Sequence, residues 1–170
     1  MPIVRPEGVR VLVHLLWPVA DPDAVPLTAE AIERMVTYAT RYAETLNVGV
    51  LAVGGTSDHL HLLIDLAPEL SLERTVRDLM APTQRFLRDV MGFAGFAWDA
   101  SGYAAAGVSP SERERVVAYV RDQRALHAGG DLDPDLELTG PPSHPESSGD
   151  EDGVPDWLRG ILNKEGESEP

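Results

Sequence analysis

Two histidines two residues apart are the residues of this sequence whose type and spacing most directly suggest chemistry. They lie in the segment Asp58-His59-Leu60-His61-Leu62-Leu63-Ile64, which is otherwise apolar after its first residue. Because alternate side chains of a β-strand point to the same face, His59 and His61 would lie side by side while the leucines between them face a core. Two imidazoles at this spacing can bind one divalent cation together. The alternative is a pair of ordinary strand histidines, and this segment alone leaves both interpretations open.

A tyrosine and a glutamine follow about sixty residues downstream. Ser109-Pro110 predicts the start of a helix reaching about residue 127, with Tyr119 and Gln123 one turn apart on one face. A cation held by two histidines and an amide oxygen would keep positions open for water and a phosphate. A tyrosine hydroxyl, with a pKa of about 10, is a poor nucleophile until a metal or a base assists it, and could then form a phosphotyrosine. The alternative is that Tyr119 simply belongs to the core.

The elements around these residues follow the order strand, helix, strand, strand, helix, strand. This order predicts an α+β fold, a ferredoxin-like βαββαβ sandwich, with an added C-terminal helix carrying the tyrosine. Its first and third strands are central, which would place the histidine pair in the middle of the sheet. Pro82 should kink or split the second helix. The predicted elements span residues 9–17, 28–46, 47–53, 59–66 and 71–91, with a short strand after residue 102.

Four arginines of the second predicted helix fall within about 60° of arc at 100° per residue. Such a stripe could contact the phosphates of DNA. The alternative is a set of ion pairs with acidic residues one turn away on a solvated face, such as Arg74 with Asp78. The arginines of this candidate DNA-binding stripe are Arg74, Arg77, Arg85 and Arg88.

The charge divides the chain into two parts. Residues 1–129 carry 12 arginines against 16 acidic residues, whereas residues 130–170 carry 2 basic against 12 acidic residues, out of a net charge of −14. We therefore predict a folded domain over 1–129 and an acidic, mostly disordered tail over 130–170, with a short amphipathic segment at 154–162. A mildly acidic folded part is unusual for a protein that binds DNA.

Composition also limits the compartment and the type of site. The chain has no cysteine, so neither a disulfide nor a thiolate zinc site is available. No apolar run approaches the roughly 20 residues of a membrane span, and the N-terminus lacks the pattern of a signal peptide. These features predict a cytoplasmic protein without membrane contact.

Over about residues 8 to 128 the sequence resembles the single-tyrosine HUH transposases, meaning the small insertion-sequence transposases and the REP-associated tyrosine transposases. Three segments carry the resemblance: the HUH motif at His59-Leu60-His61, the stretch from Trp98 through Gly102-Tyr103 to Ser109, and Tyr119-Val-Arg-Asp-Gln123. The HUH motif is weak alone, but the three segments together at these distances are specific.

The resemblance implies that Tyr119 is the nucleophile and that His59, His61 and Gln123 bind Mg²⁺ or Mn²⁺. The implied reaction is cleavage and rejoining of single-stranded DNA through a covalent 5′-phosphotyrosine. The implied partners are single-stranded or hairpin DNA and a second copy of the chain, since members of the family are usually dimers. In some members the tyrosine helix serves the histidine pair of the other subunit.

Two other functions stay open at this point. The first is a domesticated, non-catalytic member that binds a DNA hairpin or another protein, with the acidic tail as its working part. The second is a metal phosphoesterase for a small molecule, in which Tyr119 is only structural. All four proposed catalytic residues are present, which favours the transposase or single-strand nuclease.

Overall fold

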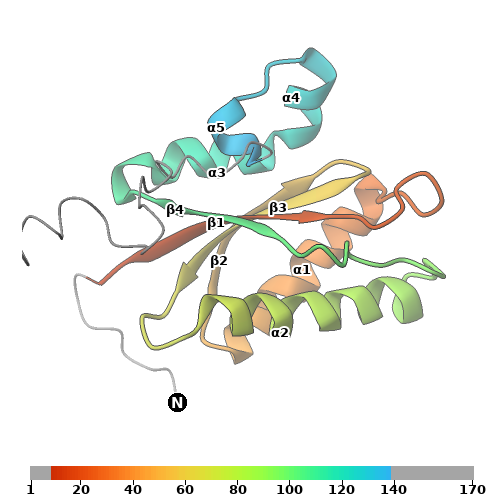
Figure 1. The fold of residues 1–170 in the computed structure, drawn as a ribbon, viewed down its shortest axis with the longest axis horizontal. Helices are drawn as coiled ribbons and strands as arrows, with labels where there is room; N and C mark the ends of the chain where they lie inside the picture. The colour runs from red at the N-terminus through yellow and green to blue at the C-terminus, as the bar shows by residue number, and fades with distance from the viewer. Residues whose placement is uncertain (1–8, 139–170) are drawn as a thin grey trace, which may run out of the picture. The chain divides into compact units, whose positions relative to one another are not determined.

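The computed structural model describes residues 9–138, so the segment predicted at 154–162 lies outside the described residues. Four antiparallel strands form one sheet in the order β2-β3-β1-β4. Figure 1 shows α1 and α2 on one face of this sheet and α3, α4 and α5 on the other. The elements are β1 (Val11–Pro18), α1 (Ala29–Thr45), β2 (Gly49–Gly55), β3 (His59–Leu66), α2 (Leu72–Arg85), a π-helical turn (Phe86–Val90), β4 (Ala104–Val108), a 3₁₀ turn (Pro110–Glu112), α3 (Arg113–Arg121), α4 (Gln123–Gly129) and α5 (Pro134–Glu137).

The predicted ferredoxin-like α+β fold is confirmed. The element order is βαββαβ before α3, and the central strands are β1 and β3. These two strands pair so that Leu16 lies opposite His61 and Pro18 opposite His59. The histidine motif therefore lies on a strand with a hydrogen-bonded neighbour on each side, which restrains the backbone that carries it.

Strand β3 is buried along its whole length because helices cover both faces of the sheet. Leu60 and Leu62 belong to the larger core, which also contains Val76 and Leu79 of α2. Leu63 belongs to a smaller cluster with Val116 and Val120 of α3 and Ala52 of β2. The alternation along β3 thus directs its leucines at 60 and 62 to α1 and α2, and its histidines to the side of α3.

Two helices differ from the sequence expectation. Helix α2 runs across Pro82 without splitting, and the irregularity comes later, as the π-helical turn that follows Arg85. Buried packing by Val76 and Leu79 before the proline, and by Leu87 after it, holds this segment on the sheet. The single helix predicted around the tyrosine instead divides at Asp122, whose φ of −92° and ψ of 9° leave the helical region between α3 and α4.

The folded unit continues past the boundary predicted at residue 129. Gly130 ends α4 in the left-handed conformation with φ of +73°, and the side chain of Asp133 caps the short helix α5. Glu137 of α5 is buried, with 6% of its surface exposed. The acidic composition that predicted disorder from residue 130 was therefore misleading for α5, because polar contacts with the rest of the fold hold this helix.

Among residues 9–138, no helix combines the length and the apolar character that crossing a membrane would need.

Candidate metal and nucleophile site

His59 and His61 lie side by side on the face of β3 that α3 and α4 cover. Their ring centroids are 5.0 Å apart and their planes cross at 80°. Both side chains are buried, with His61 fully enclosed. Since only Nε2 and Nδ1 of an imidazole can bind a metal, the partners of each nitrogen decide what the pair can do.

Each of these histidines uses Nδ1 for a hydrogen bond within the protein. His59 Nδ1 lies 2.8 Å from Asp58 Oδ1 and 3.1 Å from Thr56 Oγ1. His61 Nδ1 lies 2.9 Å from His14 Nε2 of β1. Fixing one ring nitrogen in this way orients the other, and it is the usual arrangement of histidines that bind metals through Nε2. His61 Nε2 is buried and has no hydrogen-bond partner among the described residues.

Helices α3 and α4 bring the predicted glutamine and tyrosine to the histidine pair of the same chain. Gln123 Oε1 lies 3.3 Å from His59 Nε2. The ring of Tyr119 stands perpendicular to that of His61, with centroids 6.1 Å apart. The side-chain nitrogen of Gln123 donates a hydrogen bond to the Tyr119 carbonyl oxygen at 3.4 Å. This bond keeps the two residues together across the helix break at Asp122.

The Tyr119 hydroxyl donates a hydrogen bond to Glu137 Oε1. Burial, together with the hydrogen bond to the Glu137 carboxylate, raises the pKa of Tyr119 to about 12. The hydroxyl is therefore protonated at neutral pH in the absence of a cation.

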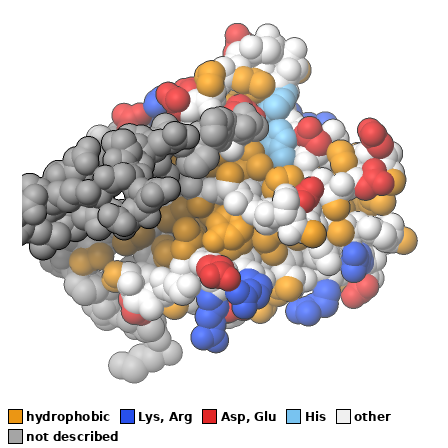
Figure 2. All heavy atoms as spheres, viewed as in Figure 1, with side chains coloured by type: hydrophobic (Ala, Val, Ile, Leu, Met, Phe, Trp, Pro, Cys, Tyr) orange, Lys and Arg blue, Asp and Glu red, His pale blue; other side chains and the backbone are white. Residues whose placement is uncertain are grey.

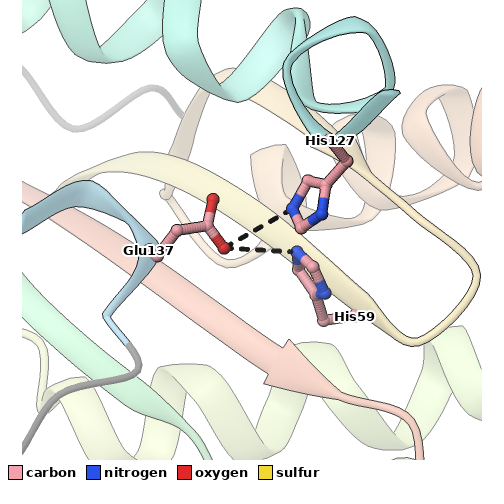
Figure 3. A group of neighbouring side chains, drawn as sticks. All are labelled: His59, His127 and Glu137. Carbon is pink, nitrogen blue, oxygen red and sulfur yellow. Dashed lines mark ion pairs between the residues drawn. The ribbon is translucent and has the colours of Figure 1, made fainter. Parts of the chain in front are cut away.

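The structure adds three residues that the sequence analysis did not single out, namely His14, His127 and Glu137. Glu137 Oε2 lies 3.9 Å from both His59 Nε2 and His61 Nε2, and 3.5 Å from His127 Nε2. Figure 3 shows the imidazoles of His59 and His127 pointing toward this carboxylate. His127 follows Gln123 by four residues, and this spacing predicts that both lie on the same face of a helix. No local pattern predicted a role for Glu137.

Electrostatics keep two of the histidines neutral. Burial lowers the pKa of His61 to about 2, and the neighbouring His14, His59 and His127 lower it as well. Burial also lowers the pKa of His14 to about 4, although Glu137 opposes that shift. A neutral imidazole has a lone pair to offer, so this cluster suits a cation better than an anion.

The donor set fits a divalent cation. Ligand atoms of His59, His127 and Glu137 all lie within 4.8 Å of one another. His127 Nε2, like that of His61, is buried without a hydrogen-bond partner among the described residues. Buried nitrogens left without partners are costly unless something binds them, and a metal ion would satisfy both. Histidine side chains reach the surface beside α4 (Figure 2), and the side chain of His127 is 29% exposed, so one edge of the cluster is in contact with solvent.

A glycine lets the helix carrying the tyrosine lie directly on the sheet. A Cβ added at Gly54 of β2 would come within 1.8 Å of the Val120 carbonyl oxygen, one residue after Tyr119. Because only a hydrogen fits there, backbone meets backbone, and this contact sets the distance between the tyrosine and the histidine strand.

The arginine stripe lies elsewhere. All four arginines are exposed on α2 and its following turn, on the opposite side of the sheet from the histidines. Arg74 pairs with Asp78 at 3.5 Å and Arg77 with Glu73 at 2.7 Å, while Arg88 donates to the Phe96 carbonyl. On the face of the molecule that Figure 2 shows, acidic side chains accordingly lie among the basic ones.

Comparisons with known proteins agree with this architecture. The family described as "Transposase IS200 like" matches residues 9–123, and the chain belongs to this family of transposases. That range contains the histidine pair and ends at Gln123. Comparison with curated proteins finds no relative.

Two solved structures share the fold. A candidate transposase from Deinococcus radiodurans R1 is 21% identical, with a TM-score of 0.53 over 72% of this chain and 98% of that one. A REP-associated tyrosine transposase bound to a REP hairpin is 12% identical, with a TM-score of 0.52 over 78% of this chain and 76% of that one. The likeness at these identities concerns the fold, and the hairpin belongs to the second protein.

Proposed function

We propose that this chain cleaves and rejoins single-stranded DNA, with Tyr119 as the nucleophile and a divalent cation as cofactor. One observation carries the proposal: Gln123 Oε1 lies 3.3 Å from His59 Nε2, while Tyr119 stands one turn before Gln123 against His61. A nucleophile and a set of metal ligands therefore meet in one buried site, as a phosphoryl-transfer enzyme requires.

His59, His61 and Gln123 would hold Mg²⁺ or Mn²⁺. When bound, the cation supplies positive charge that polarises the scissile phosphate. The Tyr119 oxygen forms a bond to phosphorus as the bond from phosphorus to the 3′ oxygen breaks, and the 3′ oxygen leaves as a free hydroxyl after gaining a proton. The phosphate stays on the 5′ side as a phosphotyrosine. Glu137 Oε1, which accepts the Tyr119 hydrogen bond, is placed to take the proton that the nucleophile loses. Rejoining is the reverse reaction with another 3′ hydroxyl.

The proposed partner is single-stranded or hairpin DNA. Membership of the transposase family supports this, and so does the structural neighbour that was solved with a REP hairpin. The stripe of Arg74, Arg77, Arg85 and Arg88 would contact DNA away from the cleaved bond, because it lies across the sheet from Tyr119. A homodimer remains part of the proposal, by analogy with the family.

The test is covalent capture. Labelled single-stranded hairpin DNA from the sequence flanking the gene is incubated with the protein and Mn²⁺, and the products are separated on a denaturing protein gel. Wild type should give a slow-migrating adduct that Tyr119→Phe and a double His59→Ala, His61→Ala variant do not. Hairpin binding without any adduct would instead favour the non-catalytic hairpin-binding module.

A further inference from the structure

The carboxylate of Glu137 serves two sides of the site with its two oxygens. Oε1 accepts the hydrogen bonds of the Tyr119 hydroxyl and, at 3.4 Å, of the Gln123 amide. Oε2 faces three imidazole nitrogens, of His59, His61 and His127. The contact with Tyr119 therefore accounts for only one oxygen of the carboxylate, and Oε2 is left facing the imidazoles.

The separations between these atoms are close to those of ligands around a single small cation. Neighbouring ligands of an octahedral ion with bonds of about 2.1 Å lie about 3 Å apart. Gln123 Oε1 is 3.3 Å from His59 Nε2, and Glu137 Oε2 is 3.5 Å from His127 Nε2 and 3.9 Å from His61 Nε2. Shortening each of these three separations by less than about 1 Å would give the spacing of neighbouring ligands. The donor atoms of His59, His127 and Glu137 all lie within 4.8 Å of one another, whereas His61 is not part of that group.

We propose that His127 Nε2 and Glu137 Oε2 are two further ligands of the cation, so that α4 and α5 complete a metal site begun on β3. The inference rests on the proposed function in one respect, that His59, His61 and Gln123 bind the metal. Five protein ligands would leave one position of an octahedral ion for the phosphate oxygen of the DNA, which keeps the site open for catalysis.

The enlarged donor set also selects among metals. Mg²⁺ prefers oxygen ligands and retains several waters, whereas imidazole suits transition metals. Three imidazoles together with one carboxylate and one amide oxygen therefore favour Mn²⁺ or another transition metal over Mg²⁺. We expect Mn²⁺ to bind at least about tenfold more tightly than Mg²⁺ to the full-length protein.

Metal binding should in addition hold α5 in place. Helix α5 has only four residues, which is too short to be stable by itself. Besides its contacts with the site, the ion pair of Asp133 with Arg115 and the packing of Leu136 against α3 hold it, and a bound cation would add to these contacts. Hydrogen exchange of residues 131–138 in the wild-type protein should slow when Mn²⁺ is added, and this measurement needs no variant. Exchange that is equally fast with and without bound Mn²⁺ would overturn the proposal.

The affinity test compares Mn²⁺ binding, followed by calorimetry or by the electron paramagnetic resonance of free Mn²⁺, in full-length variants without DNA. Glu137→Gln and His127→Ala should each weaken binding by about tenfold or more. Asp135→Asn is the matched control, since it removes the same charge from an exposed residue of the same helix.

The outcomes separate this inference from the proposed function. If Mn²⁺ binds to wild type, is lost with His59→Ala, and is unchanged in both Glu137→Gln and His127→Ala, then the inference is wrong while the proposed site stands. If wild type itself binds no divalent metal, the metal dependence in the proposed function fails with it. An equal loss in Asp135→Asn would also overturn the inference, because it would reduce the effect to net charge.

Discussion

His14 of β1 and His61 of β3 are joined by a hydrogen bond between ring nitrogens, with His14 Nε2 2.9 Å from His61 Nδ1. Both rings are buried, and only one of the two nitrogens can donate. A neutral His61 that binds a cation through Nε2 must carry its proton on Nδ1, so it is the donor and His14 the acceptor. With His14 as the acceptor, the hydrogen bond is compatible with the His61 tautomer that presents the Nε2 lone pair to the site.

We predict that His14→Ala weakens Mn²⁺ binding by about 10- to 100-fold, the usual effect of removing the partner of a metal-binding histidine. Calorimetric titration of the full-length protein measures it. Leu12→Ala is the matched control, since Leu12 lies on the same face of β1 and is also buried, but its side chain offers no hydrogen bond. Equal affinities in His14→Ala and wild type would show that His61 needs no partner to bind.

The fold should lose stability in acid when no metal is bound. The pKa of His14 is about 4 and that of His61 about 2 in the folded protein, below the ordinary value of 6.5. Between pH 6.5 and 4 the unfolded chain therefore binds more protons, and the free energy of unfolding falls as the pH falls. Each histidine should contribute a loss of about 2 kcal/mol between pH 7 and pH 5.

Denaturant unfolding at the two pH values, with a chelator present, measures this loss. Because acidic residues also titrate toward pH 4, NMR titration of the imidazole signals serves as the control. We expect His14 and His61 to remain neutral at pH 5 in the folded protein. If all imidazoles of the folded protein titrated near pH 6.5, the burial argument would not hold.

The hydroxyl of Tyr119 should resist deprotonation until about pH 12 in the metal-free protein, because burial and Glu137 both raise its pKa. The difference between the ultraviolet pH titrations of wild type and Tyr119→Phe isolates this tyrosine from the other three. In Glu137→Gln the midpoint should move down, since a neutral amide replaces the carboxylate that holds the proton. An unchanged midpoint would leave burial as the sole cause.

Gly54→Ala should destabilise the protein by about 1–3 kcal/mol or more, the cost of forcing a methyl group into a filled space. It should also weaken Mn²⁺ binding, because the added Cβ pushes the Val120 backbone away and carries Gln123 and His127 with it. Gly107→Ala in β4 is the control, since nothing lies within 4 Å of its added Cβ. Similar stability and affinity in the two variants would contradict the close approach of α3 to β2.

Local patterns predicted the half of the site that comes from one strand and one helix. The alternation of apolar residues placed His59 and His61 on a single face, and β3 begins and ends as the sequence predicts. Helical spacing likewise put Tyr119 one turn before Gln123. Glu137 escaped prediction because its neighbours are acidic residues and prolines typical of a disordered tail. Its burial depends on partners 18 and 10 residues earlier, Tyr119 and His127, which no local pattern encodes.

The contact between Gly54 and the Val120 backbone binds the tyrosine helix to the sheet of its own chain. Every side chain of the proposed site, from His14 to Glu137, then comes from a single polypeptide. If the proposed dimer keeps this arrangement within each chain, an intact chain goes on working beside a defective one. Two chains with different defects, one in Tyr119 and the other in His59, would not repair each other. A mutated gene copy would then give an inactive protein that does not inhibit the intact one.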